Sequence, residues 1–168
     1  MNITTRKMVL ADCEHVAPLL QKNAQSNHGG LFGEYPLKKV EGMFKTSLNT
    51  VIAQESDKVA GVVFSFSVSS ESLPPVAKKI VELYPNLTQD DWFYGPVCID
   101  ENYRGQGLLA KLCDKICSLN TGKPIAFINL DNIASLKAHE KIGFSEAGRF
   151  KLDNVDWLVL VKEDPFRE

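Results

Sequence analysis

The segment "PVCIDENYRGQGLLAKLCDKI", Pro96–Ile116, constrains the fold more than any other part of the chain. Three apolar residues, Val97–Ile99, predict a strand that ends at an acidic pair. Gly105 and Gly107 then mark a loop, and apolar residues recur with helical spacing from Leu108 onward. A strand that leads through a helix into a further strand calls for a parallel pair with a right-handed crossover.

The remaining sequence predicts hairpins on both sides of this unit. β-rich runs around polar turns predict hairpins over 49–55 with 59–68 and over 146–152 with 155–162. Further strands are expected over 2–5, 92–99 and 124–130, and helices from Asp12, over 36–44 and 74–84, from 108 to about 120, and from Asp131 or Asn132 to Ile142. The Gly95-Pro96 pair predicts a bulge in its strand. We expect an α+β fold with a mixed, mostly antiparallel central sheet and helices on both faces.

Length and charge limit the kind of protein this can be. The chain has 168 residues and predicts a single domain, 1–168. A net charge of −2 is unlike the basic surface of nucleic-acid-binding proteins, so no nucleic acid is expected as partner. No segment has the length and apolar content of a membrane span or a signal peptide, so we expect a cytoplasmic protein that does not bind membranes. The four cysteines contain no C-x-x-C pair and are expected to be small buried hydrophobes.

The glycine loop has the features of an anion site. The first N–H groups of a helix lack internal partners, and the helix dipole is positive there. Glycine lets the backbone approach a phosphate closely, and Arg104 adds a permanent charge. The alternative is a tight turn that needs Gly105 and Gly107 only for its shape. The sequence matches neither a Rossmann fingerprint nor a P-loop, which weakens a third interpretation, a plain nucleotide-phosphate binder.

Two segments resemble motifs of the GNAT superfamily of N-acetyltransferases. "YRGQGLLAKL" resembles motif A through Arg104 and Gly107, although Leu109 stands where Gly or Ala is usual. "NIASLKAHEKIGF", 132–144, resembles motif B in the expected order downstream. Its matching residues are Asn132, Ser135, Glu140, Lys141, Gly143 and Phe144.

The resemblance implies acetyl-CoA as the donor and no metal. Backbone amides of the glycine loop would hold its pyrophosphate, and its pantetheine arm would lie beside the strand that the bulge opens. The implied cofactor-binding residues are Val97, Cys98, Ile99, Arg104, Gly105, Gln106, Gly107, Leu108, Leu109, Asn132 and Ser135.

The resemblance also implies direct attack of an amine on the thioester. Strand amides around Val97 and Cys98 would stabilise the developing oxyanion. His139 occupies the position where many relatives carry a tyrosine acid, and histidine donates protons near neutral pH, so His139 is predicted as the acid. The alternative is a packing or surface histidine. Tyr94 and Glu101 are further catalytic candidates, with Glu34, Glu71, Asp90, Asp91 or a water chain as other bases.

The acceptor is predicted to be a small-molecule or peptide amine that meets the loop "SNHGGLFGEYP". Phe32, Glu34 and Tyr35 are the candidate residues, because charge and aromatic rings together suit an amine. The C-terminal hairpin is expected to expose apolar strands, which makes a homodimer an expectation. The competing function is a non-catalytic acyl-CoA-binding sensor or regulatory module, which the departures at Leu109 and His139 leave open.

Overall fold

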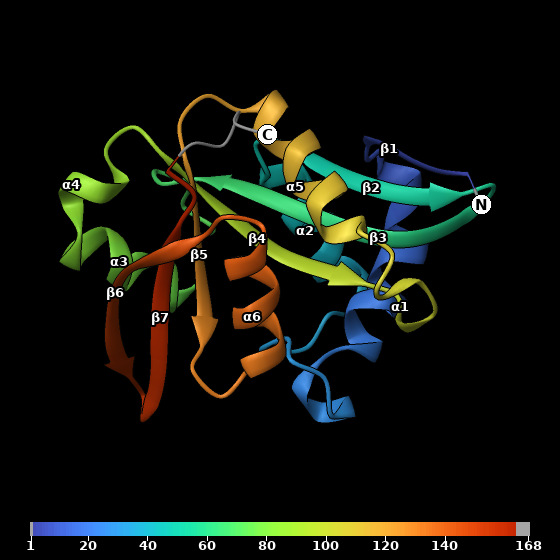
Figure 1. The fold of residues 1–168 in the computed structure, drawn as a ribbon. Coiled ribbons are helices and arrows are strands. Elements are labelled where there is room, and N and C mark those ends of the chain that lie inside the picture. The colour runs from blue at the N-terminus through green and yellow to red at the C-terminus, as the bar shows by residue number, and fades with distance from the viewer. Residues whose placement is uncertain (1, 164–168) are drawn as a thin grey trace.

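A single twisted sheet forms the centre of the molecule, and helices cover both of its faces (Figure 1). The computed structural model describes residues 2–163. The sheet has seven strands in the order β1-β2-β3-β4-β5-β7-β6. Neighbouring strands are antiparallel except β4 and β5, which are parallel. The predicted mixed, mostly antiparallel sheet is therefore confirmed.

The elements agree closely with those expected from the sequence. The strands are β1 Ile3–Lys7, β2 Thr50–Glu55, β3 Lys58–Ser67, β4 Trp92–Ile99, β5 Pro124–Asn129, β6 Ser145–Leu152 and β7 Val155–Val161. The α-helices are α1 Cys13–Lys22, α2 Leu37–Thr46, α3 Pro75–Leu83, α4 Pro85–Thr88, α5 Leu108–Leu119 and α6 Ile133–Lys141. Short 3-10 turns are η1 Leu10–Asp12, η2 Gln25–Asn27 and η3 Glu101–Tyr103. The sequence analysis did not anticipate α4, a single turn that Pro85 opens.

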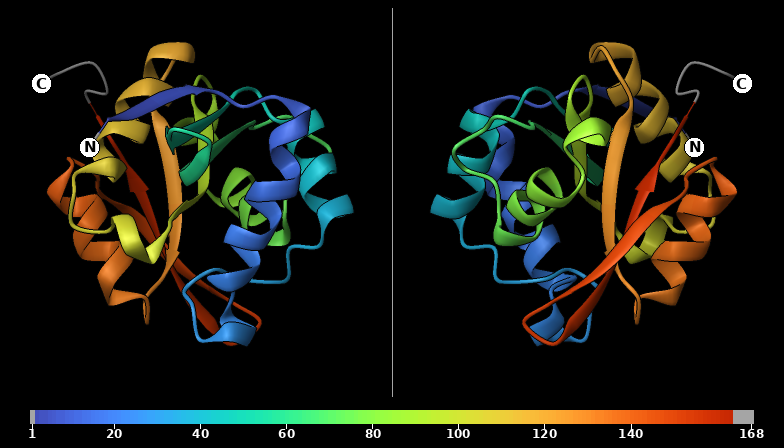
Figure 2. Two further views of the ribbon diagram at one scale, coloured as in Figure 1. Left: turned by 90° about the vertical axis from the view of Figure 1, so that its right-hand side faces the viewer. Right: turned by 90° about the vertical axis from the view of Figure 1, so that its left-hand side faces the viewer.

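Each face of the sheet has its own hydrophobic core. Helices α1, α2 and α3 cover one face, where Leu20, Val40 and Ile80 pack against strand residues such as Phe64. Helices α5 and α6 lie on the opposite face, and α5 contributes Leu112 and other residues to the second core (Figure 2). The alternation of side chains along a strand explains how one sheet supplies both cores. All four cysteines are buried and free, as predicted.

Asp12 stabilises the start of α1 in a way that differs from the predicted cap. Its backbone is already helical, and its carboxylate accepts from Val9 N at 2.8 Å and so caps the preceding 3-10 turn. Arg6 donates to both carboxylate oxygens of Asp12 at 2.9 Å. Burial raises the pKa of Asp12, but the hydrogen bonds from Arg6 and Val9 outweigh burial and hold that pKa below its ordinary value.

The expected exposure of the C-terminal hairpin is wrong. Strand β7 lies between β5 and β6, and its residues from Trp157 to Val161 are buried, the last four of them in the two cores. Within the hairpin the edge strand is β6, which presents charged residues such as Glu146 and Arg149 to solvent. The apolar run is therefore covered by the chain's own sheet, while the homodimer itself stays a prediction.

Candidate active site

Strands β4 and β5 separate after a short parallel contact. They pair only at Trp92 with Pro124 and at Phe93 with Ile125. Where β4 pairs with β3, Gly95 and Pro96 lie opposite the single residue Phe64, which is the predicted bulge. Beyond this point the edge of β4 that faces β5 has no partner strand within residues 2–163 (Figure 1). The backbone of 95–99 is thus open to an extended ligand on that edge.

The glycine loop lies where β4 leads into α5. Gly105 and Gly107 each have a φ of +77°, a conformation that glycine adopts without the steric cost of a side chain. Gly107 is the N-cap of α5, so the first amides of the helix point out of its N-terminal end. Within the described residues, none of the backbone N–H groups of 104–110 donates to a protein acceptor. Seven donors therefore remain free beside the open edge of β4.

Contacts on both sides fix the loop. Asp100 accepts from Asn102 N at 2.9 Å and forms the turn that ends β4. Tyr103 is buried, and its hydroxyl donates to Glu55 Oε1 at 2.9 Å. Leu108 is also buried and anchors the start of α5 in the second core. Residues 104–107 between these anchors are exposed, so the loop presents its backbone to solvent.

A chain of hydrogen bonds links the start of α6 to β4. Asn132 caps α6 and accepts from Ser135 N at 3.3 Å. Ser135 O lies 2.8 Å from His139 Nδ1, and His139 Nε2 lies 3.2 Å from the hydroxyl of Tyr94. Both rings are buried and pack against Phe144, with ring centroids 5.1 and 5.3 Å from its ring. Asn132, Ser135, His139 and Tyr94 therefore form one continuous network.

The partners of His139 determine where its proton lies. Ser135 O is a carbonyl that can only accept, so Nδ1 carries the hydrogen and Nε2 accepts from the Tyr94 hydroxyl. Burial lowers the pKa of His139, and the hydrogen bond to Ser135 opposes this only in part. Burial also raises the pKa of Tyr94 well above its ordinary value. The pair is consequently a neutral imidazole that receives a hydrogen bond from a neutral phenol.

Solved structures share this arrangement of elements over nearly their whole length. The acetyltransferase of the GNAT family from Streptococcus pneumoniae superposes with a TM-score of 0.66 at 13% identity, covering 96% of this chain and 99% of that chain. AAC(6')-Ib in complex with paromomycin and acetyl-CoA gives 0.69 at 16% identity, covering 97% and 94%. A chain of the NatC complex bound to Gag peptide and CoA gives 0.67 at 16% identity, covering 97% and 99%.

This chain has the GNAT fold. No protein-family model and no curated protein sequence matches the chain, so the agreement lies in the structure. The segment that resembles motif A forms the turn from β4 into α5, and the segment that resembles motif B forms α6 and the turn after it.

The predicted catalytic residues fall into two groups. The gap that opens where β4 and β5 separate is called the splay. Tyr94 and His139 are in direct contact at its closed end. Glu101 lies beyond the other end of β4, and strand geometry puts it on the order of 15 Å or more from Tyr94. Its carboxylate accepts from Lys22 Nζ at 2.9 Å on the surface. The structure therefore does not bring Glu101 to the pair.

The predicted acceptor residues lie in the segment between α1 and α2. Phe32 is exposed, and its ring meets Trp157 edge-on at 5.2 Å between centroids. Glu34 accepts from Gln21 at 2.6 Å and from Ser26 at 2.9 Å, and these bonds lower its pKa. Tyr35 is buried, and its hydroxyl donates to Phe32 O at 2.8 Å. Phe32 and Glu34 are thus accessible, whereas Tyr35 supports the loop from beneath.

Asn23 was not predicted from the sequence as a residue of the site. It follows the last residue of α1, and its Oδ1 accepts from Arg104 Nη2 at 2.6 Å. Arg104 Nε also donates to Ile99 O at 3.4 Å. The guanidinium is therefore directed toward α1. The position of Asn23 at a helix end was the only sequence signal available.

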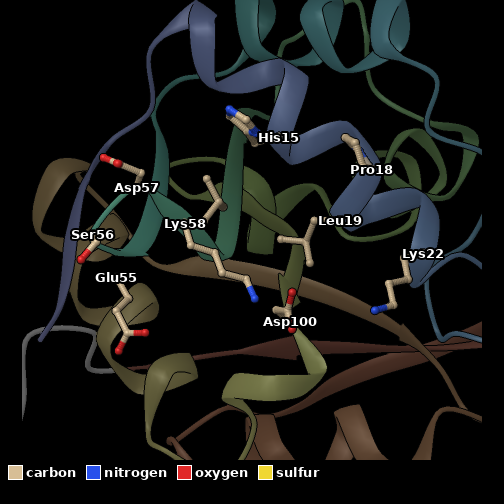
Figure 3. Close-up of a pocket in the computed structure, with 10 residues that line it drawn as sticks. His15, Pro18, Leu19, Lys22, Glu55, Ser56, Asp57, Lys58 and Asp100 are labelled. Atoms are coloured by element: carbon tan, nitrogen blue, oxygen red, sulfur yellow. The ribbon is translucent and has the colours of Figure 1, made fainter. Parts of the chain in front are cut away.

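A surface hollow lies beside the glycine loop, between α1 and the β2–β3 turn (Figure 3). Lys22, Lys58 and Asp100 extend into it, so charges of both signs line its wall. None of the predicted catalytic, cofactor or acceptor residues lines this hollow.

Residues 2–163 contain neither a candidate metal-ion site nor a candidate membrane-spanning helix. No group of three His, Cys, Asp or Glu side chains in this part is placed to hold a metal ion. None of its helices combines the length and the apolar character needed to cross a membrane.

Proposed function

We propose that the chain is an N-acetyltransferase that transfers the acetyl group of acetyl-CoA to a primary amine of a small molecule or peptide. In this proposal residues 1–168 form one acetyltransferase domain. The free cysteines suit a reducing compartment, and we place the protein in the cytoplasm.

One observation carries the proposal. The backbone amides of 104–110 have no acceptor in the described part of the chain, and they surround the positive end of α5 next to the unpaired edge of β4. Amides in this arrangement bind phosphate oxygens, and the open strand edge suits the amide groups of a pantetheine arm. The structurally similar AAC(6')-Ib and NatC proteins were crystallised with acetyl-CoA and CoA respectively, which supports this donor.

Bound acetyl-CoA supplies an activated thioester, which the amine attacks directly so that a C–N bond forms and the C–S bond breaks. Residues 104–109 hold the diphosphate, and Val97, Cys98 and Ile99 line the arm. Asn132 and Ser135, at the N-terminal end of α6, contact the pantetheine side of the donor in this proposal. Backbone amides near Val97 face the carbonyl oxygen and stabilise negative charge on it.

We assign the proton that the leaving sulfur requires to Tyr94, with His139 as its partner. His139 Nε2 accepts from Tyr94 in the described arrangement and has no proton to give, whereas Tyr94 holds one on its hydroxyl. Tyr94 is the first residue of β4 beyond the paired positions, which puts it at the closed end of the splay. His139, fixed by Ser135, keeps the phenol in place.

Water receives the proton that the amine loses, and a proton returned from water to the Tyr94 phenolate restores the site. Hydrogen bonds from Gln21 and Ser26 lower the pKa of Glu34, which makes it a weak base. Glu101 is paired with Lys22. Among the other predicted bases, Asp91 accepts from Lys123 N at 2.9 Å, and it precedes β4 at the end opposite Glu101.

The acceptor enters past the segment between α1 and α2. The AAC(6')-Ib structure contains paromomycin and the NatC structure a Gag peptide, which supports a small-molecule or peptide acceptor. Phe32 offers an exposed ring and Glu34 a carboxylate, a combination that suits a cationic amine.

Calorimetry with coenzyme A, followed by a free-thiol release assay with acetyl-CoA and a panel of amines and peptides, tests the proposal. Binding of coenzyme A and amine-dependent thiol release are expected. Failure to bind coenzyme A would overturn it.

The second candidate is a non-catalytic acyl-CoA-binding module. The observation in its favour is that both ring nitrogens of His139 are already engaged inside the protein. Tight binding of acetyl-CoA with no thiol release across a broad acceptor panel would support this module over the enzyme.

A further inference from the structure

Arg104 joins the glycine loop to the end of helix α1. Its guanidinium donates to Asn23 Oδ1 at 2.6 Å and to Ile99 O at 3.4 Å. One acceptor terminates α1 and the other terminates β4. These two fixed acceptors together set the orientation of the planar guanidinium of Arg104. Its backbone N–H, by contrast, remains free with the other loop amides.

Asn23 is also the root of the loop 24–31, which leads toward Phe32 and Glu34. Its Nδ2 donates to Leu19 O at 2.9 Å, which fixes the side chain against α1. Its carbonyl accepts from Leu31 N at 3.0 Å, which closes the loop. A Cβ on Gly29 would come within 1.9 Å of Asn23 O, so the loop folds tightly onto this residue. Displacement of Asn23 therefore displaces the whole loop.

The tip of the loop 24–31 contacts Asn132 at the cap of α6, which is the second part of the proposed acetyl-CoA site. Asn132 Nδ2 lies 3.5 Å from Gly30 O, and a Cβ on Gly30 would come within 2.5 Å of Asn132 Nδ2. The loop is consequently held at its root by Arg104 of the glycine loop and at its tip by the cap of α6. Figure 1 shows this segment crossing from α1 toward the start of α6.

We infer that Arg104 and Asn23 act together as a clip that positions the loop 24–31 beside the predicted acceptor residues. In this inference the backbone amides of the glycine loop hold the diphosphate without the Arg104 guanidinium. Both residues are positioning residues, since they act through the loop 24–31. This inference deepens the proposed function and rests on it for the location of the diphosphate. The clip itself rests on the contacts alone.

Single and double variants test whether the Arg104 side chain positions the loop 24–31 or binds the diphosphate. Asn23→Ala, Arg104→Gln and the double variant are compared with wild type by calorimetry with coenzyme A and by hydrogen–deuterium exchange of residues 24–31. Each single variant should raise exchange in the loop about tenfold, as loss of one structural hydrogen bond predicts. The double variant should add little to either one, because the two residues share one interaction. The dissociation constant for coenzyme A should change less than about threefold in all three variants.

Lys22→Gln is the matched control. Lys22 precedes Asn23, and its exposed ion pair with Glu101 joins the same two segments. The variant removes a positive charge beside the glycine loop but leaves the clip intact, so loop exchange should stay at the wild-type rate.

Weakening of coenzyme A binding by about tenfold or more in Arg104→Gln, with Asn23→Ala unaffected, would mean that the guanidinium binds the diphosphate and would overturn the inference. Unchanged loop exchange in both single variants would overturn it as well. If wild type itself fails to bind coenzyme A, the proposed function fails, while the exchange measurement still tests the clip.

Discussion

The hydroxyl of Tyr94 lies 3.2 Å from His139 Nε2, although the two residues are 45 positions apart in the sequence. The contact brings the end of α6 against β4 at the point where β4 and β5 separate. Both groups are buried and each satisfies the other, which a buried polar pair requires. The pair therefore links the stability of the second core to the proposed chemistry.

Replacement of Tyr94 by phenylalanine should lower kcat for amine-dependent thiol release by about 10²-fold, because it removes the proton donor. Binding of coenzyme A should stay close to wild type, since the glycine loop is intact. Steady-state kinetics and calorimetry on the same preparation measure both quantities. Tyr84→Phe is the control, since it removes a hydroxyl whose partner is Arg149 O, away from the splay. Equal kcat in Tyr94→Phe and wild type would remove Tyr94 from the mechanism.

Stability should depend on pH through His139. Burial lowers the pKa of His139 in the folded state below the ordinary value of 6.5, so the unfolded chain binds the proton more tightly. The contribution of neutral His139 to the free energy of unfolding is complete above about pH 6.5. It is lost as the pH falls from there to the folded-state pKa, by at most about 1.4 kcal/mol per pH unit. Denaturant unfolding at several pH values between about 5 and about 8 measures the slope of the free energy of unfolding against pH.

The His139→Gln variant should lose this part of the pH dependence. His15→Gln, which removes an exposed histidine on α1, should retain the wild-type slope. A slope that persists in His139→Gln would assign the pH dependence to another group.

Replacement of Gly107 by alanine should weaken coenzyme A binding by about tenfold, because an L-residue at a φ of +77° costs about 1–2 kcal/mol and shifts the first amides of α5. Gly42→Ala is the matched control. Gly42 lies inside α2, where an added Cβ meets no atom within 4 Å, and alanine there should stabilise the helix by up to about 1 kcal/mol. Calorimetry and thermal unfolding together separate the two effects. Wild-type affinity in Gly107→Ala would show that the loop conformation is not needed for the donor.

Replacement of Asp12 by asparagine should lower the free energy of unfolding by about 1–2 kcal/mol near neutral pH. The variant weakens two hydrogen bonds from Arg6, whose side chain is 40% exposed and so only partly desolvated. Because the pKa of Asp12 is below its ordinary value of 3.8, this contribution is present above about pH 3.8 and is lost as the pH falls through the folded-state pKa. Wild type and variant should therefore converge in stability at low pH, whereas Glu14→Gln at an exposed neighbour should follow wild type throughout.

Local patterns in the sequence were sufficient to predict most of the fold. The turn between β6 and β7 contains Asp153 and Asn154, both with positive φ, and this pair is typical of tight hairpins. The bulge at Gly95-Pro96 and the cap at Asn132 were likewise predictable, because each depends on the conformational preferences of the residues themselves.

The contacts of the candidate site were less predictable, since they join distant segments. Arg104 and Asn23 are 81 positions apart, and neither residue type specifies the other as a partner. The burial of β7 depended on strand order, because an apolar run in a hairpin is equally compatible with an edge or an interior strand. Tertiary packing decided both outcomes.

The strand order also determines when the sheet around β5 can be completed during synthesis. Among the seven strands of this sheet β7 is synthesised last, yet it is the antiparallel neighbour of β5, which forms one wall of the splay. Until residues 155–161 have emerged, β5 lacks that neighbour and its apolar side chains remain uncovered. A nascent chain can therefore acquire a complete donor groove only after residues 155–161 have emerged.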